Sequence, residues 1–141
     1  MRPSNPVLDL FLRLVVAFEV VLYLVAALLH LGLQIPLGSV TLAVPDRILP
    51  AAIVETILGL ALAANFVALT RANPGWKGIT IGIHLIVVAG VLLGMLALAL
   101  RVGPPPGPHW TIHYVMLGAL AVIALLMLIL RKSGQVDPVQ P

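Results

Sequence analysis

The sequence predicts an all-α integral membrane protein, an up-down bundle of four transmembrane helices, on two observations. Of the 141 residues, 61% are hydrophobic and only 9% are charged, whereas about a quarter of the residues in a soluble domain are charged. So few charges cannot cover a water-soluble surface, and most of this surface must face the lipid bilayer. In addition, four segments have about the 20 apolar residues that a transmembrane helix needs. These segments of a single membrane domain are residues 7–33, 48–70, 79–100 and 111–130.

The stretches between these segments carry residues that end helices. Pro36 and Gly38 follow the first span, and residues 73–75 (Asn-Pro-Gly) form a turn between the second and third. The proline-rich run 103–108 cannot be helical, because proline lacks an amide hydrogen. Residues 39–44 favour strands, and we expect them to lie on the membrane surface or, as the favoured alternative, to form a small lid over the helix ends. The predicted outer loops are residues 34–47 and 101–110, the inner loop is 71–78 and the tail is 131–141.

The distribution of lysine and arginine predicts how the helices cross the membrane, because cytoplasmic loops are enriched in these residues. An even number of spans places both termini on one side. Most of the basic residues share that side, namely Arg2, Arg13, Arg71, Lys77, Arg131 and Lys132, against Arg47 and Arg101 on the other. Both termini are therefore predicted to be cytoplasmic. The chain has no cysteine, which excludes disulfides and thiolate metal ligands, and it has no basic stripe of the kind that binds nucleic acid.

Polar residues inside the spans form a predicted inner layer. Such residues are costly in lipid and usually face the protein interior. Their depth is counted at about 1.5 Å per residue from the nearest basic residue at the cytoplasmic end of the same span. By this count, three of the polar residues lie about 9–11 Å inside the cytoplasmic boundary. These are Glu19, Asn65 and His84, each on a different span. The layer is interpreted as a structural hydrogen-bonded network, with a proton or ion relay through Glu19 or a contact to a quinone as alternatives.

A second, outer layer is predicted near the other membrane boundary. It combines His30, Glu55 and His113, with His109 and Arg101 as further candidates. Imidazole and carboxylate ligands suit a divalent metal, and His30 with His113 could be the axial pair of a haem b. A hydrogen-bonded polar rim near water is the favoured alternative.

The first span links the two layers. Glu19 and His30 are eleven residues apart, so they share a helix face and are separated by about 16 Å along it. Tyr23 lies between them on that face. The two end residues are too far apart for a single site, and the stretch is interpreted as a strut between two polar layers.

The third span carries a GxxxG pattern at Gly90 and Gly94. This spacing lets helix backbones approach closely. Packing within the bundle is the favoured interpretation, and a homodimer through this face is the alternative.

Residues 11–71 resemble the DoxX-like small membrane proteins of prokaryotes. The segment 11–14 (Phe-Leu-Arg-Leu), the segment 55–62 (Glu-Thr-Ile-Leu-Gly-Leu-Ala-Leu) and the pair 70–71 (Thr-Arg) carry this resemblance. It implies a four-helix bundle in the cytoplasmic membrane that serves as a small subunit or partner of oxidoreductases, with Arg13 and Glu55 as the corresponding positions. The segment 17–20 (Ala-Phe-Glu-Val) is similar, more weakly, to the small multidrug transporters.

The predicted function is a non-catalytic subunit or partner of a membrane redox or respiratory complex, in contact with other membrane proteins or with a second copy. Two alternatives stay open. One is a haem- or metal-binding electron-transfer protein that uses His30 and His113. The other is a small proton-coupled transporter that uses Glu19.

Overall fold

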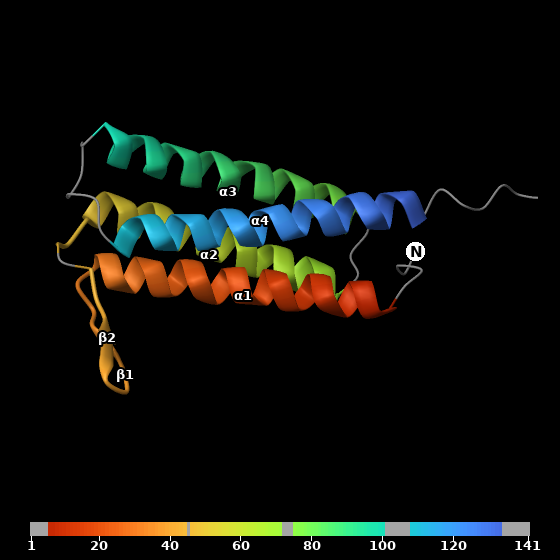
Figure 1. Ribbon diagram of the computed structural model, residues 1–141. Coiled ribbons are helices and arrows are strands. Elements are labelled where there is room, and N and C mark those ends of the chain that lie inside the picture. Colours follow the sequence, from red (N-terminus) through yellow and green to blue (C-terminus); the bar gives the residue numbers. More distant parts are fainter. Residues whose placement is uncertain (1–5, 45, 72–74, 101–107, 134–141) are drawn as a thin grey trace, which may run out of the picture.

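The computed structural model describes residues 6–44, 46–71, 75–100 and 108–133, without the side chains of 37, 40, 108–110 and 130–133. It confirms the predicted all-α four-helix bundle. The helices are α1 (Pro6–His30), α2 (Leu49–Thr70), α3 (Trp76–Ala99) and α4 (Pro108–Ser133), and the loop after α1 adds the strands β1 (Ile35–Leu37) and β2 (Val40–Leu42). Successive helices run in opposite directions, so that α1 begins and α4 ends at one end of the bundle, and the hairpin lies at the other (Figure 1). We call these the terminal end and the hairpin end.

The helices form a closed ring of contacts. The packing of α1 against α2 is the most extensive, α2 also packs against α3, and α4 contacts both α1 and α3. Consequently α1 lies across the bundle from α3, with α4 in front and α2 behind in the view of Figure 1.

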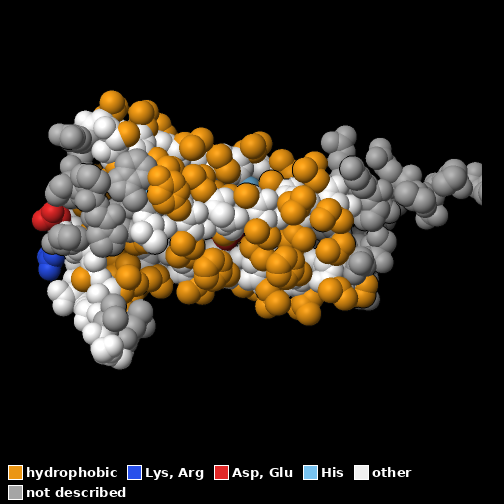
Figure 2. All heavy atoms as spheres, in the orientation of Figure 1, with side chains coloured by type: hydrophobic (Ala, Val, Ile, Leu, Met, Phe, Trp, Pro, Cys, Tyr) orange, Lys and Arg blue, Asp and Glu red, His pale blue; other side chains and the backbone are white. Residues whose placement is uncertain are grey.

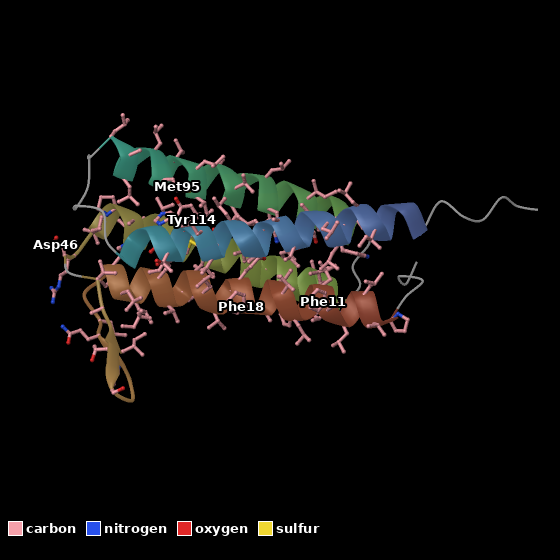
Figure 3. All side chains as sticks on the ribbon, viewed as in Figure 1. Phe11, Phe18, Asp46, Met95 and Tyr114 are labelled. Carbon is pink, nitrogen blue, oxygen red and sulfur yellow. The ribbon has the colours of Figure 1, made fainter. Side chains whose placement is uncertain are left out.

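Hydrophobic side chains cover the outside of the bundle. Figure 2 shows them along the whole flank of the helices, while the charged side chains of this face gather at the hairpin end. Phe11 and Phe18 are about half exposed, at 48% and 51%, and point away from the neighbouring helices (Figure 3), and Asp46 lies at the hairpin end. All four helices are long and apolar enough to cross a membrane. The chain is thus a multi-pass membrane protein, with lipid as the solvent of its exposed apolar surface.

The interior contains two hydrophobic clusters. One lies towards the hairpin end and includes Tyr23, Leu58, Leu62, Val87, Val91, Met116 and Leu120. The other lies towards the terminal end and includes Leu12, Val16, Leu69, Trp76, Ile123 and Leu126. On α1, α2 and α3 a buried polar residue separates the positions of the two clusters, at Glu19, Asn65 and Thr80. The predicted inner layer is therefore a polar belt between two apolar regions.

The end of α1 comes earlier than the hydrophobic pattern predicts. The pattern continues to Leu33, but the helix ends at His30. Gly32 has a φ of +91°, and its N–H bonds the carbonyl of Leu29 while the N–H of Leu33 bonds the carbonyl of Leu28. This pair of bonds is a Schellman motif, which terminates a helix through a left-handed residue that is usually glycine.

The hairpin does not form the lid that was the favoured prediction. Strands β1 and β2 pair in antiparallel register around the turn at Gly38, whose φ is +65°. They make their main contacts with each other, and the hairpin points sideways, past α1, rather than over the helix ends (Figure 1). At its base, the N–H of Ile48 donates to the carbonyl of His30 at 2.9 Å. This bond joins the two ends of the loop, and the strands between them extend away from the bundle (Figure 1).

Candidate functional site

A buried hydrogen bond joins α1 to α2 at the hairpin end. His30 is the last residue of α1 and Glu55 lies near the start of α2, so the antiparallel packing of these helices brings the two side chains together. The Nδ1 atom of His30 lies 2.6 Å from Oε2 of Glu55, and the two residues are only 4% and 7% exposed. A contact this short is typical of a hydrogen bond that carries charge.

A cavity of about 450 Å³ lies beside this pair. Its walls come from all four helices and are mostly apolar, and its polar groups are Tyr23, His30, Glu55 and His113. Small-molecule sites in proteins are typically apolar cavities of about 300–1,000 Å³ with a few convergent polar groups. We call this cavity the outer cavity.

The two glycines of the GxxxG pattern line the outer cavity. A Cβ atom at Gly94 would lie 2.8 Å from Nε2 of His113, and one at Gly90 would lie 2.8 Å from Cδ1 of Leu58. Both positions therefore face other helices of the same chain. Their lack of a side chain leaves room for His113 and Leu58 and keeps the cavity open.

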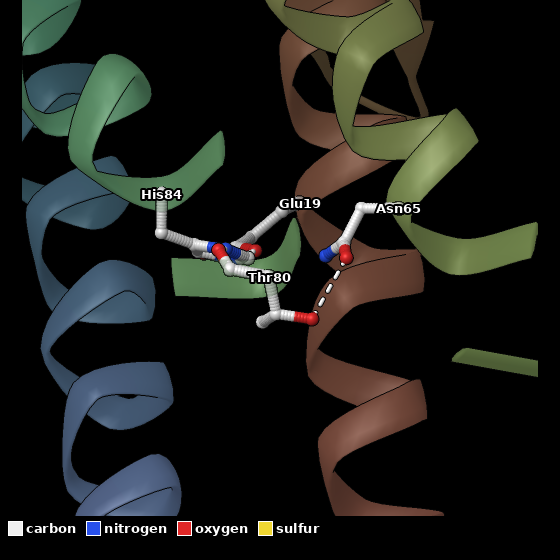
Figure 4. A network of polar contacts seen from close by, with 4 residues as sticks. All are labelled: Glu19, Asn65, Thr80 and His84. Atoms are coloured by element: carbon white, nitrogen blue, oxygen red, sulfur yellow. Dashed lines mark hydrogen bonds and ion pairs between the residues drawn. The ribbon is translucent and has the colours of Figure 1, made fainter. Parts of the chain in front are cut away.

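The inner layer is a hydrogen-bonded chain across α1, α2 and α3 (Figure 4). The Nε2 atom of His84 lies 2.9 Å from Oε2 of Glu19, and Nδ1 of His84 lies 2.7 Å from the carbonyl oxygen of Thr80. The hydroxyl of Thr80 donates to Oδ1 of Asn65 at 2.8 Å. Since α1 and α3 lie across the bundle from one another, the contact between Glu19 and His84 spans its interior.

The geometry of His84 defines where one proton lies. A carbonyl oxygen only accepts hydrogen bonds, so Nδ1 of His84 carries a hydrogen that it donates to Thr80. The contact between Nε2 and Glu19 then needs one further proton, held either by an imidazolium or by a neutral carboxylic acid. The pair of His84 and Glu19 thus shares a single proton between nitrogen and oxygen.

Three buried polar atoms complete this region. They are Oε1 of Glu19, the hydroxyl of Tyr23 and Nδ2 of Asn65, and none has a hydrogen-bond partner within the described parts of the chain. All three residues are at most 1% exposed.

A second cavity of about 540 Å³ lies between α3 and α4, nearer the terminal end. It is mostly apolar, and its polar lining residues are Lys77, Thr80 and His84. We call it the inner cavity. His84 therefore has the inner cavity on one side and Glu19 on the other.

The structure places some predicted residues together and leaves others undecided. His30, Glu55 and His113 line one cavity, and Glu19, Asn65 and His84 form one network. Arg101 and the side chain of His109 lie outside the described residues. Within the described ranges, no group of three or more His, Asp or Glu residues is suited to hold a metal ion, so the predicted divalent-metal site has no support there.

One member of the network, Thr80, was not predicted from the sequence. It is one helical turn before His84, on the same face of α3, and its carbonyl and hydroxyl both bond within the inner layer. That spacing of four residues was the available signal.

Fold and site define a class: a multi-pass four-helix membrane protein with an internal polar belt and a cavity of ligand size. Comparison with known protein families, with curated proteins and with solved structures finds no match to this chain. The resemblance to DoxX-like proteins stays a prediction from the residues that carry it.

Proposed function

We propose that this chain binds a lipid-soluble quinone in the outer cavity and acts as a small subunit or partner of a membrane redox complex. The observation that carries the proposal is the composition of this cavity. It combines largely apolar walls with the hydrogen-bonded pair of His30 and Glu55, together with His113 and Tyr23.

These groups match the chemistry of a quinone. A quinone ring is apolar and flat, and its carbonyl oxygens accept hydrogen bonds, so it suits an apolar cavity with a few polar groups. Reduction to the quinol takes up two electrons and two protons. The imidazole of His30 and the carboxyl of Glu55 would exchange protons with the oxygen atoms of the quinone, and a partner oxidoreductase would supply or accept the electrons.

The proposed orientation places the outer cavity near the outer face of a prokaryotic cytoplasmic membrane. Among the described basic residues, Arg13, Arg71 and Lys77 lie at the terminal end and Arg47 lies at the hairpin end. Together with the wider distribution of lysine and arginine, this supports cytoplasmic termini.

Quinone binding to the purified protein tests the proposal. We expect a short-chain ubiquinone or menaquinone analogue to bind in calorimetric titration. We expect Glu55→Gln to weaken this binding about tenfold, because a tenfold change corresponds to about 1.4 kcal/mol, which is the net free energy of one hydrogen bond. Asp9→Asn is the matched control, because Asp9 forms a partly exposed ion pair with Arg13 in the first turns of α1, at the end of the bundle opposite the outer cavity.

Three results would contradict the proposal. The first is the absence of binding to the wild-type protein, and the second is equal binding by Glu55→Gln. The third is a Soret absorbance band in the purified protein that disappears in His30→Ala and in His113→Ala, which would assign the cavity to haem instead.

A further inference from the structure

Of the three buried polar atoms without partners among the described residues, those of Glu19 and Asn65 lie in the belt between the two hydrophobic clusters, and that of Tyr23 belongs to the cluster towards the hairpin end. Glu19 and Tyr23 are one turn apart on the same face of α1, and both are buried. Asn65 reaches the same level from α2 and is held through its oxygen by Thr80 (Figure 4). Buried polar groups in proteins are nearly always paired, and ordered water supplies the partners that side chains do not.

These atoms belong to a line of groups that runs from the lining of one cavity to the lining of the other, with gaps where no hydrogen bond joins the described side chains. On one side, His84 lines the inner cavity and shares a proton with Glu19. On the other side, Tyr23 lines the outer cavity together with Glu55. Tyr23 is therefore one helical turn from Glu19 on α1 and shares the lining of the outer cavity with Glu55.

We propose that this line of groups conducts protons between the inner and outer cavities, with internal water bound by Glu19, Tyr23 and Asn65. Glu19 is the central proton carrier and the hydroxyl of Tyr23 is the relay. This activity goes beyond quinone binding and does not depend on it.

The transfer balances as one proton in and one proton out. His84 gives the proton on Nε2 to Glu19, whose carboxyl group rotates and releases a proton to the internal water. The water protonates the hydroxyl oxygen of Tyr23 while Tyr23 releases its own proton, through a further internal water, to Glu55. Glu55 then gives up one proton to the outer cavity, and His84 regains one proton from the inner cavity. Only N–H and O–H bonds form and break, no electron moves, and rotation of the hydroxyl groups prepares the next transfer.

The surroundings of Glu19 favour this role. Its polar neighbours are Tyr23 on its own helix, Asn65 from α2, and His84 and Thr80 from α3, while α4 adds the apolar Met116 and Leu120 around Tyr23. Farther along α1, Arg13 and Asp9 pair with each other. A carboxyl group that is enclosed by apolar side chains and shares a proton with an imidazole can change its protonation state without contact with bulk water.

Proton flux into liposomes tests the inference. The full-length protein is reconstituted with a pH-sensitive dye inside, no quinone is added, and a potassium gradient with valinomycin drives protons across. We expect flux above that of protein-free liposomes for the wild type, and loss of this flux in Glu19→Gln and in Tyr23→Phe. Tyr114→Phe is the matched control, because it makes the same chemical change at a side chain of α4 that is 59% exposed (Figure 3), and we expect it to conduct like the wild type.

Each outcome decides the inference. Wild-type flux equal to that of protein-free liposomes overturns it, and so does wild-type flux in Tyr23→Phe. Should Glu19→Gln fail to fold, Tyr23→Phe still decides, because that change removes a hydroxyl with no partner in the described structure. The assay contains no quinone, so its failure is distinguishable from failure of quinone binding.

Discussion

At the scale of single residues, the pair of His30 and Glu55 is the interaction whose loss we expect to cost most stability. Both side chains are buried, and removing one partner of a buried hydrogen bond leaves the other unsatisfied, which costs about 1–3 kcal/mol and more for a charged group. Glu55→Ala should therefore lower the melting temperature in detergent far more than Asp9→Ala, whose ion pair with Arg13 is partly exposed and contributes about 0.3–0.5 kcal/mol. Equal melting temperatures for the two variants would show that His30 does not depend on Glu55.

The hydroxyl of Thr80 gives a second prediction at this scale. It is fully buried and donates to Asn65, and side-chain hydrogen bonds inside membrane proteins contribute about 0.6 kcal/mol on average and up to about 1.7 kcal/mol. We expect Thr80→Val to cost near the upper value, because the buried oxygen of Asn65 would then lose the partner it has among the described residues. Thr70→Val is the control, since the hydroxyl of Thr70 is exposed and bonds only the carbonyl of Val67, and this variant should unfold in detergent at the wild-type denaturant concentration. Comparable losses in both variants would argue against the network.

The sequence identifies these residues well, because an ionisable or amide group within a span is rare enough to be noticed. Counting from the basic residues at the span ends places Glu19, Asn65 and His84 at one depth, and the structure joins them through Thr80. Threonine was missed because a small hydroxyl group is common in transmembrane helices. Which residue each histidine bonds depends on how its helix is rotated about its own axis. The depth of a residue in the membrane, counted from the sequence, does not give this rotation.

At the scale of elements, the glycine that ends α1 makes the clearest prediction. Gly32 has a φ of +91°, and a Cβ atom there would lie 2.7 Å from Nε of Arg47. Gly32→Ala should destabilise the fold by about 1–3 kcal/mol, since a residue with a side chain is strained in this conformation. Gly78→Ala is the control, because Gly78 lies within α3 with open space around it, and alanine there should be neutral or add up to about 1 kcal/mol. Thermal unfolding in detergent measures both, and equal stability of the two variants would contradict the assigned end of α1.

The position of this helix end also shows what hydrophobic periodicity leaves out. Leu31 and Leu33 continue the apolar pattern beyond the last helical residue, so the predicted span is too long. The end depends on backbone hydrogen bonds around Gly32. The base of the hairpin is likewise closed by the bond between Ile48 and His30, two residues that no short-range pattern connects.

At the scale of the whole molecule, the composition predicts a bundle of membrane-spanning helices. The contacts between helices then show which helix faces pack within the chain. The low content of charged residues requires lipid-facing helices, and the structure shows four of them. However, the GxxxG pattern alone leaves packing within one chain and packing between two chains open. In the structure Gly90 and Gly94 face Leu58 and His113 of their own chain, which favours an internal role.

Alanine at Gly94 separates the internal role from dimerisation. Its methyl group would displace His113 into the outer cavity, because the new Cβ atom would lie 2.8 Å from Nε2. We therefore expect Gly94→Ala to weaken quinone binding by about tenfold or more, an effect of about 1.4 kcal/mol or more, without changing the mass measured by light scattering in detergent. Gly82→Ala is the matched control, because Gly82 lies on the same helix with open space around it, and both its binding and its mass should equal those of the wild type. If the wild type is a dimer and Gly94→Ala dissociates it, this face of α3 is instead a contact between two copies of the chain. Residues of both copies would then line the outer cavity.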